Sequence, residues 1–343
     1  MAVTSVVSTR FLASRISNQL RCWLSYALSL FGIVRVRHLP TFVSVEPANF
    51  CQLHCPECPV GIASSPNRPI ASRLMPLFVF ERALEQVQPT AHTMQFYFQG
   101  EPLLNRQLPE MITRAHQAGL YTIVSTNAQA LTSLTAQRLV KSGLSRIIVS
   151  IDGFSEESYA AYRVGGSLHR ALEGLQFLHE AKEQCRSSIR IELQVLRLKT
   201  NEHEWSWIKK NYKKLGATHL VFKTAQLYNF EHGHPLMPTD ERYSRYRKTA
   251  NGTYIHKSSH LSPLALSPHR LIASQPCLRL WSGCVITTSG DILPCCYDKE
   301  HRHALGNITT LSLSEIFHSS KANNLRKHIL KGNLPEMCKN CDH

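Results

Sequence analysis

The chain has 343 residues, of which 43% are hydrophobic and 18% charged, and its formal net charge at pH 7 is +15. This length and apolar content are sufficient for one barrel-sized domain with a large core and a small second module. The net charge favours acidic partners, but the chain has no long basic run and no recognised nucleic-acid motif, so no specific nucleic acid is expected.

Residues 1–40 form an N-terminal segment that we predict to be helical. The apolar stretch at 21–34 is too short to span a bilayer, and the chain shows no clear small-residue cleavage site after it. We interpret it as an amphipathic or packing helix. Contact of this helix with the membrane interface stays open as an alternative.

Residues 41–229 alternate between short apolar runs and stretches with helical spacing. Apolar residues recur at helical spacing at 77–87, 108–115, 134–142, 168–178 and 205–215. Gly119 follows the second of these helices, where a left-handed cap is expected. The predicted strands lie at 41–47, 94–98, 121–125, 146–151, 189–196 and 219–222. This alternation predicts an α/β fold, a partial (β/α)6 TIM-like barrel whose open side another segment must cover.

The last third of the chain has a different character. Glycine and proline interrupt 230–276 repeatedly, which predicts a linker or active-site loop that also lies over the open face of the barrel. Residues 277–343 form a small Cys-rich module. It contains a predicted hairpin at 285–293 and a mostly helical stretch at 313–330.

The eleven cysteines gather at 51–58 and 277–341, with only Cys22 and Cys185 outside these two groups. Disulfide scaffolds are usually short chains, so this distribution indicates intracellular metal binding. The first group, spaced C-x3-C-x2-C, follows the first predicted strand and consists of Cys51, Cys55 and Cys58. Three thiolates on one short loop are suitable ligands for an iron–sulfur cluster with one open iron. A zinc knuckle with His54 as fourth ligand is the alternative.

Polar residues follow three consecutive predicted strands at their carboxyl ends, where parallel α/β barrels carry their function. They are Gly100 and Glu101 in Gln99-Gly100-Glu101-Pro102, then Ser125 and Asn127, then Ser150 and Asp152. Each segment could be an ordinary turn. Three of them in a row after the cysteine motif indicate one binding site.

Together these motifs make 42–223 resemble the radical S-adenosylmethionine (SAM) superfamily. The resemblance implies a [4Fe-4S] cluster held by Cys51, Cys55 and Cys58, whose open iron chelates SAM and whose electron cleaves SAM to a 5′-deoxyadenosyl radical. It also implies that Gly100-Glu101-Pro102 receives the SAM amino group, although Gln99 replaces the first glycine of the family's motif. The serine and aspartate or asparagine pairs would contact the rest of SAM, and Arg163 would pair with its carboxylate.

The tail resembles the SPASM/Twitch extension of radical SAM enzymes through Gly290-Asp291, Pro294-Cys295-Cys296, Leu305-Gly306-Asn307-Ile308 and a final C-x2-C. The resemblance implies one auxiliary [4Fe-4S] cluster, because the cysteines that a second cluster would need are absent. The expected ligands are Cys277, Cys295, Cys338 and Cys341. Cys296 is the alternative to Cys295, and Cys284 is expected to be a buried thiol.

The function implied is that of a radical SAM oxidoreductase. It would abstract a hydrogen atom from its substrate, and the auxiliary cluster would accept a second electron. The sequence favours a small substrate such as an amino sugar or alcohol, because residues 1–40 are too few for a typical peptide-recognition domain. Modification of a peptide is the alternative within this class, and a zinc-stabilised nucleic-acid-binding module is the alternative outside it. The expected electron donor is a reductant such as flavodoxin or ferredoxin, and the expected location is the cytoplasm.

Overall fold

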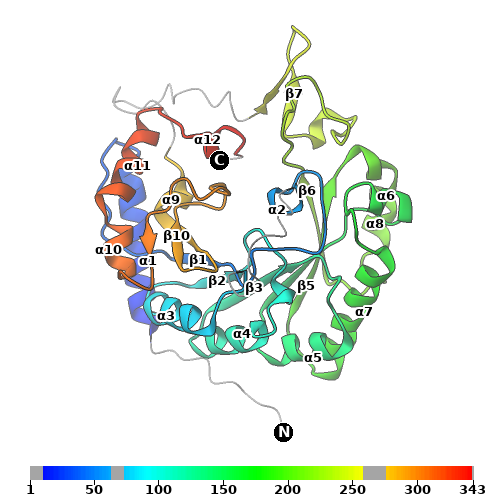
Figure 1. Cartoon of the computed structure of the whole chain (residues 1–343), viewed down its shortest axis with the longest axis horizontal. Helices are drawn as coiled ribbons and strands as arrows, with labels where there is room; N and C mark the ends of the chain where they lie inside the picture. The colour runs from blue at the N-terminus through cyan, green and yellow to red at the C-terminus, as the bar shows by residue number, and fades with distance from the viewer. Residues whose placement is uncertain (1–10, 63–72, 258–275, 342–343) are drawn as a thin grey trace.

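The computed structural model describes residues 11–62, 73–257 and 276–341. Its centre is one nine-stranded sheet in the order β11-β10-β9-β1-β2-β3-β4-β5-β6 (Figure 1). All six predicted strands are present and parallel, so the open (β/α)6 barrel is confirmed. They are β1 (Phe42–Val45), β2 (Thr93–Phe96), β3 (Tyr121–Thr126), β4 (Arg146–Ser150), β5 (Arg190–Arg197) and β6 (His219–Thr224).

Helices cover the outer face of these strands (Figure 1). The apolar spacing located five of them correctly, although the last begins at Trp205 as predicted and ends early, at Asn211, where residues 212–216 form turns. Gly119 has a φ of 76° after α4, so the predicted left-handed cap is confirmed. The helices on the outer face are α3 (Leu77–Val87), α4 (Leu108–Gln117), α5 (Ser133–Lys141), α6 (Glu156–Ala160), α7 (Leu168–Gln184) and α8 (Trp205–Asn211). The short α2 (Pro59–Ile62) lies instead on the inner side of the sheet (Figure 1).

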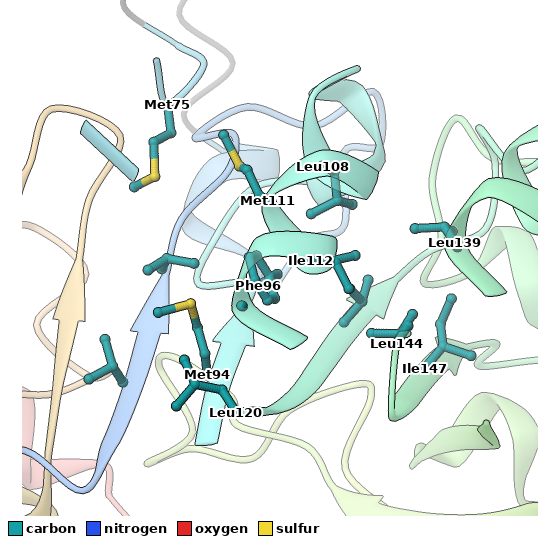
Figure 2. Packing of buried hydrophobic residues seen from close by; sticks show 14 of the residues in the cluster. Met75, Met94, Phe96, Leu108, Met111, Ile112, Leu120, Leu139, Leu144 and Ile147 are labelled. Atoms are coloured by element: carbon teal, nitrogen blue, oxygen red, sulfur yellow. The ribbon is translucent and has the colours of Figure 1, made fainter. Parts of the chain in front are cut away.

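The core lies between the sheet and these helices. Figure 2 shows Met94 and Phe96 of β2 close to Leu108, Met111 and Ile112 of α4. All five side chains are completely buried. The three α4 residues recur at positions i, i+3 and i+4, so one face of the helix carries the contact. This layer holds the carboxyl ends of the strands in a fixed arrangement.

The tail does not form a sheet of its own. Its hairpin pairs with the barrel, because β9 (Gly283–Ile286) lies parallel to β1 and continues the sheet through β10 (Asp291–Leu293) and β11 (Gly306–Asn307). The predicted helix at 313–330 is two helices. The helices of this region are α9 (Leu278–Ser282), α10 (Leu313–Phe317), α11 (Ser320–Leu330) and α12 (Glu336–Lys339).

The predicted linker contains more structure than its composition suggests. It holds a small hairpin of β7 (Tyr246–Lys248) and β8 (Tyr254–His256). Tyr246 is completely buried in an apolar cluster with Leu53 and Cys55 of the first cysteine group, which supports the expectation that this segment covers the barrel opening. The part of the linker at 258–275 lies outside the described residues.

The N-terminal helix, α1 (Leu12–Ser29), lies at the rim of the molecule beside α10 and α11 (Figure 1). Its packing differs from that of the other helices, because its polar side chains point inward.

Candidate functional site

The first cysteine group lies in the loop between β1 and α2. Cys55 is buried, while Cys51 and Cys58 are half-buried. The Cys58 N–H donates to the Cys55 carbonyl at 3.1 Å, and the His54 N–H donates to the Val164 carbonyl at 2.9 Å. These two hydrogen bonds fold the loop and hold it against the segment that follows α6.

Close backbone contacts also fix this loop. A β-carbon at Gly61 would lie 2.7 Å from both the nitrogen and the oxygen of Cys55. A β-carbon at Gly100 would lie 2.2 Å from the Ala48 oxygen, just before the cysteine loop. The motif after β2 and the cysteine motif after β1 therefore pack backbone to backbone, which only glycine permits.

Glu101 connects the ends of two strands. Its buried carboxylate accepts hydrogen bonds from the Thr126 hydroxyl at 2.7 Å, the Asn127 N–H at 2.8 Å and the Leu103 N–H at 3.1 Å. Burial raises the pKa of Glu101, and these hydrogen bonds act in the opposite direction. The side chain thus holds Asn127 in place, and direct contact of Glu101 with SAM stays a prediction.

Asn127 reaches the cysteine loop. Its Nδ2 donates to Cys51 Sγ at 3.3 Å, and its Oδ1 accepts from Gln52 Nε2 at 3.1 Å. The Leu53 N–H also donates to Cys51 Sγ, at 3.4 Å. Burial raises the pKa of the Cys51 thiol to about 12, with smaller contributions from Glu101, Cys55 and Cys58. The three cysteines and the β3 end therefore belong to one site.

Arg163 and Asp152 form a buried ion pair at the same edge of the sheet. Arg163 Nε and Nη2 lie 2.7 and 2.6 Å from Asp152 Oδ2. Burial alone would lower the pKa of Arg163, but the Asp152 carboxylate and the Cys55 thiol raise it. Arg163 Nη1 lies 4.0 Å from Cys55 Sγ, so the guanidinium stands beside the cysteine loop.

The remaining predicted residues lie at the same edge with different surroundings. Ser125 is half-buried at the end of β3, and Ser150 is buried at the end of β4. The other Asp152 oxygen, Oδ1, accepts the Leu196 N–H at 2.6 Å, so Asp152 also anchors β5. Asn201 is completely buried, and its Nδ2 donates to the Asp152 carbonyl at 2.8 Å.

The tail cysteines form a second group. Cys277, Cys295, Cys296 and Cys338 pack in one apolar cluster around Trp281. Arg279 Nη1 donates to Cys296 Sγ at 3.1 Å. Hydrogen bonding with Cys296 raises the pKa of Cys295. The same contact, helped by Arg279, lowers the pKa of Cys296 to about 6 against the effect of burial.

Two other tail cysteines differ in their surroundings. Cys341 is 7% exposed at the end of the described chain. The Tyr246 hydroxyl donates a hydrogen bond to Oδ1 of the neighbouring Asn340 at 2.9 Å, which connects the tail to the linker. Cys284 lies instead in the barrel core on β9, as a buried thiol, and burial raises its pKa to about 12.

Several residues of the site carry no signal in the sequence. Glu57 of the cysteine loop accepts the Tyr228 N–H at 2.6 Å and lies 3.2 Å from His234 Nε2. Gln99 Nε2 donates to the Lys299 carbonyl at 2.8 Å. These contacts join segments about 200 residues apart in the chain. A pattern of neighbouring residues cannot reveal them.

Basic side chains gather around Lys223 of β6. Arg146, Arg245 and Arg279 lie within electrostatic range of it, together with the acid Glu192, which pairs with Arg146 at 2.5 Å. Burial lowers the pKa of Lys223, and the three arginines act in the same direction. Positive charge therefore exceeds negative charge in the interior around Lys223.

Both cysteine groups fit iron–sulfur ligation. All eleven cysteines are free thiols. Cys51 Sγ accepts a hydrogen bond from Asn127 Nδ2, and Cys296 Sγ accepts one from Arg279 Nη1. Such N–H donors suit the sulfur ligands of a cluster. In 11–62, 73–257 and 276–341 no group of three or more His, Cys, Asp or Glu side chains is arranged for a single metal ion. His54, the fourth ligand of the alternative zinc knuckle, is exposed.

Two family models match the chain. Residues 45–191 match the radical SAM superfamily, and residues 277–342 match SPASM, an iron–sulfur cluster-binding domain. The resemblance found in the sequence is thereby confirmed. The cofactors follow from these domains: a [4Fe-4S] cluster with SAM, and auxiliary iron–sulfur ligation in the tail.

Known proteins of similar sequence and fold cover most of the chain. A PqqA peptide cyclase of Rhizobium meliloti is 27% identical over 314 residues, which are 88% of this chain and 80% of that protein. A PqqA peptide cyclase of Bradyrhizobium diazoefficiens is 24% identical over 89% of this chain and 79% of its own length. The crystal structure of Streptococcus suis SuiB, 13% identical, covers 89% of this chain and 72% of that chain with a TM-score of 0.63, which shows a shared fold.

Proposed function

Because the chain carries a radical SAM domain followed by a SPASM iron–sulfur domain, we propose that it is a radical SAM enzyme that oxidatively modifies a peptide. The observation that carries the substrate class is the similarity to two PqqA peptide cyclases along nearly the whole chain. The sequence alone favoured a small molecule because residues 1–40 are short. The relatives support the peptide alternative better.

The residues at the strand ends have distinct tasks in this proposal. Cys51, Cys55 and Cys58 hold the cluster, which with SAM supplies the hydrogen-abstracting radical when both are bound. Asp152 holds Arg163 with its guanidinium toward the loop, where it pairs with the SAM carboxylate. Glu101 orients Asn127, which donates to the Cys51 sulfur and restricts where SAM lies.

Gly100, Ser125 and Ser150 supplement this set. The main chain at Gly100 packs against Ala48 and faces the SAM amino group in this proposal. Ser125, Ser150 and the other residues of the strand ends line the remainder of the SAM site. Their polar groups and the packed loop exclude water from the reacting atoms.

The auxiliary cluster is proposed at Cys277, Cys295, Cys338 and Cys341, with Cys296 as the alternative to Cys295. Cys277, Cys295 and Cys338 pack with Cys296 in one apolar cluster, and Cys341 lies within electrostatic range of Cys338, which supports this site. One cluster is proposed, as four cysteines suffice for it. Its use is to accept the second electron of a two-electron oxidation, and flavodoxin or ferredoxin is the proposed external reductant.

The electropositive interior supports a peptide with an acidic side chain. Lys223 has Arg146 and Arg245 within electrostatic range, and Arg146 is already paired with Glu192, which leaves Lys223 and Arg245 to receive a substrate carboxylate in this proposal. An Arg or Lys contact to a carboxylate is a charge-assisted hydrogen bond and orients the substrate. A peptide glutamate or aspartate is thus favoured over a neutral residue at this position.

The test uses anaerobically reconstituted protein with SAM, a strong reductant and synthetic peptides that differ only in Glu against Gln. We expect 5′-deoxyadenosine, and loss of two hydrogen atoms from the Glu peptides in mass spectra. Lys223→Met should raise KM for the Glu peptides while leaving SAM cleavage without peptide unchanged. Oxidation of amino sugars or alcohols with no peptide product would overturn the peptide proposal. Absence of 5′-deoxyadenosine would overturn the enzyme class.

A further inference from the structure

Helix α1 packs with its polar side inward. Its buried residues recur at helical spacing and are all polar or small: Arg15, Asn18, Cys22, Ser25 and Ser29. In most surface helices the apolar stripe faces the core. The inversion in α1 leaves the apolar stripe on the outside of the molecule.

Specific hydrogen bonds hold the helix in this orientation. Arg15 donates to the carbonyl oxygens of Gln88 at 2.7 Å and Gly119 at 2.6 Å, after α3 and α4 respectively. Asn18 exchanges two hydrogen bonds with the Leu39 main chain, both at 2.9 Å. Several buried polar contacts therefore fix the rotation of α1, and a turn about its axis would break all of them.

The outward side of α1 is a row of large apolar residues. Each is at least half exposed: Leu12 55%, Ile16 50%, Leu20 64%, Trp23 53% and Leu24 62%. The row continues past the helix through Leu30, Phe31 and Ile33, which are 40%, 49% and 49% exposed. A contiguous apolar surface of this kind marks an interaction site. We name this set of eight residues the α1 face.

Positive charge borders the α1 face. Residues 1–45 contain no aspartate or glutamate. Arg21, Arg35 and Arg37 line a hollow of about 540 Å³ together with Leu24 and Leu28. The hollow combines an apolar wall with three guanidinium groups, which is suited to an anionic headgroup whose acyl chain lies along the leucines.

We propose that the α1 face binds the surface of an anionic phospholipid bilayer, with α1 lying in the plane of the interface. Trp and Leu on one side and Arg at the border are the composition of interfacial helices. None of the described helices is long and apolar enough to cross a membrane, so the contact is peripheral. A protein partner of the same shape would need an acidic rim, whereas a bilayer of anionic lipid presents that charge everywhere.

The test is cosedimentation of the full chain with vesicles of phosphatidylcholine alone or mixed with phosphatidylglycerol. Binding should require phosphatidylglycerol and weaken at high salt. Leu20→Glu with Leu24→Glu should lower the partition coefficient by at least about a hundredfold, since both leucines leave the apolar layer. Arg35→Gln with Arg37→Gln should lower it about tenfold or more.

The matched control places glutamate at two equally exposed apolar positions elsewhere. These are Phe78→Glu and Leu134→Glu, at sites 65% and 57% exposed. This variant should bind vesicles like the wild type, and all variants should keep the wild-type Tm and SAM cleavage in solution. Equal binding by the Leu20/Leu24 variant, or no binding by the wild type, would overturn the proposal. A wild-type dimer that this variant dissociates would overturn it in favour of self-association.

Discussion

Replacement of Gly100 by alanine tests the packing of the two motifs against each other. The added β-carbon would lie 2.2 Å from the Ala48 oxygen and 2.7 Å from the Phe50 nitrogen. Carbon–oxygen contacts are ordinarily about 3.3 Å or longer, so the two backbones must separate by about 1 Å. Ala48 lies three residues before Cys51, so this displacement reaches the cysteine loop directly.

Two effects determine how much Gly100→Ala changes the free energy of unfolding. Overpacking of this kind costs about 1–3 kcal/mol, and a main-chain atom yields less easily than a side chain, which favours the upper end. Alanine also lowers the conformational entropy of the unfolded chain, which offsets about 0.4–1 kcal/mol of this loss of stability. The free energy of unfolding should therefore fall by about 2 kcal/mol. SAM cleavage should fall about a hundredfold, because a shift near 1 Å spoils the alignment of reacting groups.

The assay is urea unfolding together with iron content and the rate of 5′-deoxyadenosine formation. Gly283→Ala is the matched control, since its β-carbon would lie 3.2 Å from Phe42 Cδ1 and 3.3 Å from the Phe42 oxygen, so no contact is as short as the 2.2 Å at Gly100. The control should lose less than about 1 kcal/mol and keep its SAM cleavage. Wild-type stability and a cleavage rate within about twofold for Gly100→Ala would refute the close packing of the motifs.

Three further predictions concern other parts of the molecule. Asp152→Asn leaves Arg163 buried without its partner, so urea unfolding should show a loss of about 3 kcal/mol. Burial lowers the pKa of His38 to about 4, below the 6.5 of an ordinary histidine. As the pH falls, His38 therefore becomes protonated in the unfolded chain before it does in the folded protein. The free energy of unfolding should then fall by up to about 3 kcal/mol as the pH is lowered from 6.5 to 4. In His38→Gln, urea titrations across this pH range should no longer show this fall in the free energy of unfolding. Cys338→Ser with Cys341→Ser should lower iron content by about one four-iron cluster per chain and leave SAM cleavage by the first cluster measurable.

Each of these has an outcome that would count against it. Unchanged stability of Asp152→Asn would mean that the ion pair is not the buried anchor of Arg163. A pH dependence that survives in His38→Gln would assign it to other groups. Full iron content in the Cys338/Cys341 variant would mean that the tail binds no cluster through these thiols.

Local spacing predicted the barrel well, because each of its elements has a short-range signal. The apolar period of α4 and the position of Gly119 defined that helix without any tertiary information. The pairing of β9 with β1 had no such signal, because Phe42 and Gly283 are remote in the chain. Any apolar strand could form the same backbone hydrogen bonds with β1, so the sequence of β9 does not identify its partner. The hairpin of β7 and β8 was hidden by the glycines and prolines around it.

The sequence predicted that the site residues lie at one edge of the sheet, but not the contacts among them. The three cysteines and the strand ends were located because motif residues are close in sequence. The ion pair of Asp152 with Arg163 was not foreseen, and neither was the inward polar side of α1. A helical wheel shows that a helix has two sides, but it does not show which of them has partners for its polar groups. For α1 those partners are carbonyl oxygens after α3 and α4.

The continuous sheet has a consequence for how this protein can be divided. β1 has β2 on one side and β9 on the other. A fragment ending near residue 229 would leave β1 as a bare edge strand, with Val43 and Val45 next to unpaired main-chain groups. Such edges recruit other chains, so this fragment should aggregate. The boundary between the two family models therefore falls within one continuous sheet, to which both cysteine-rich segments are attached.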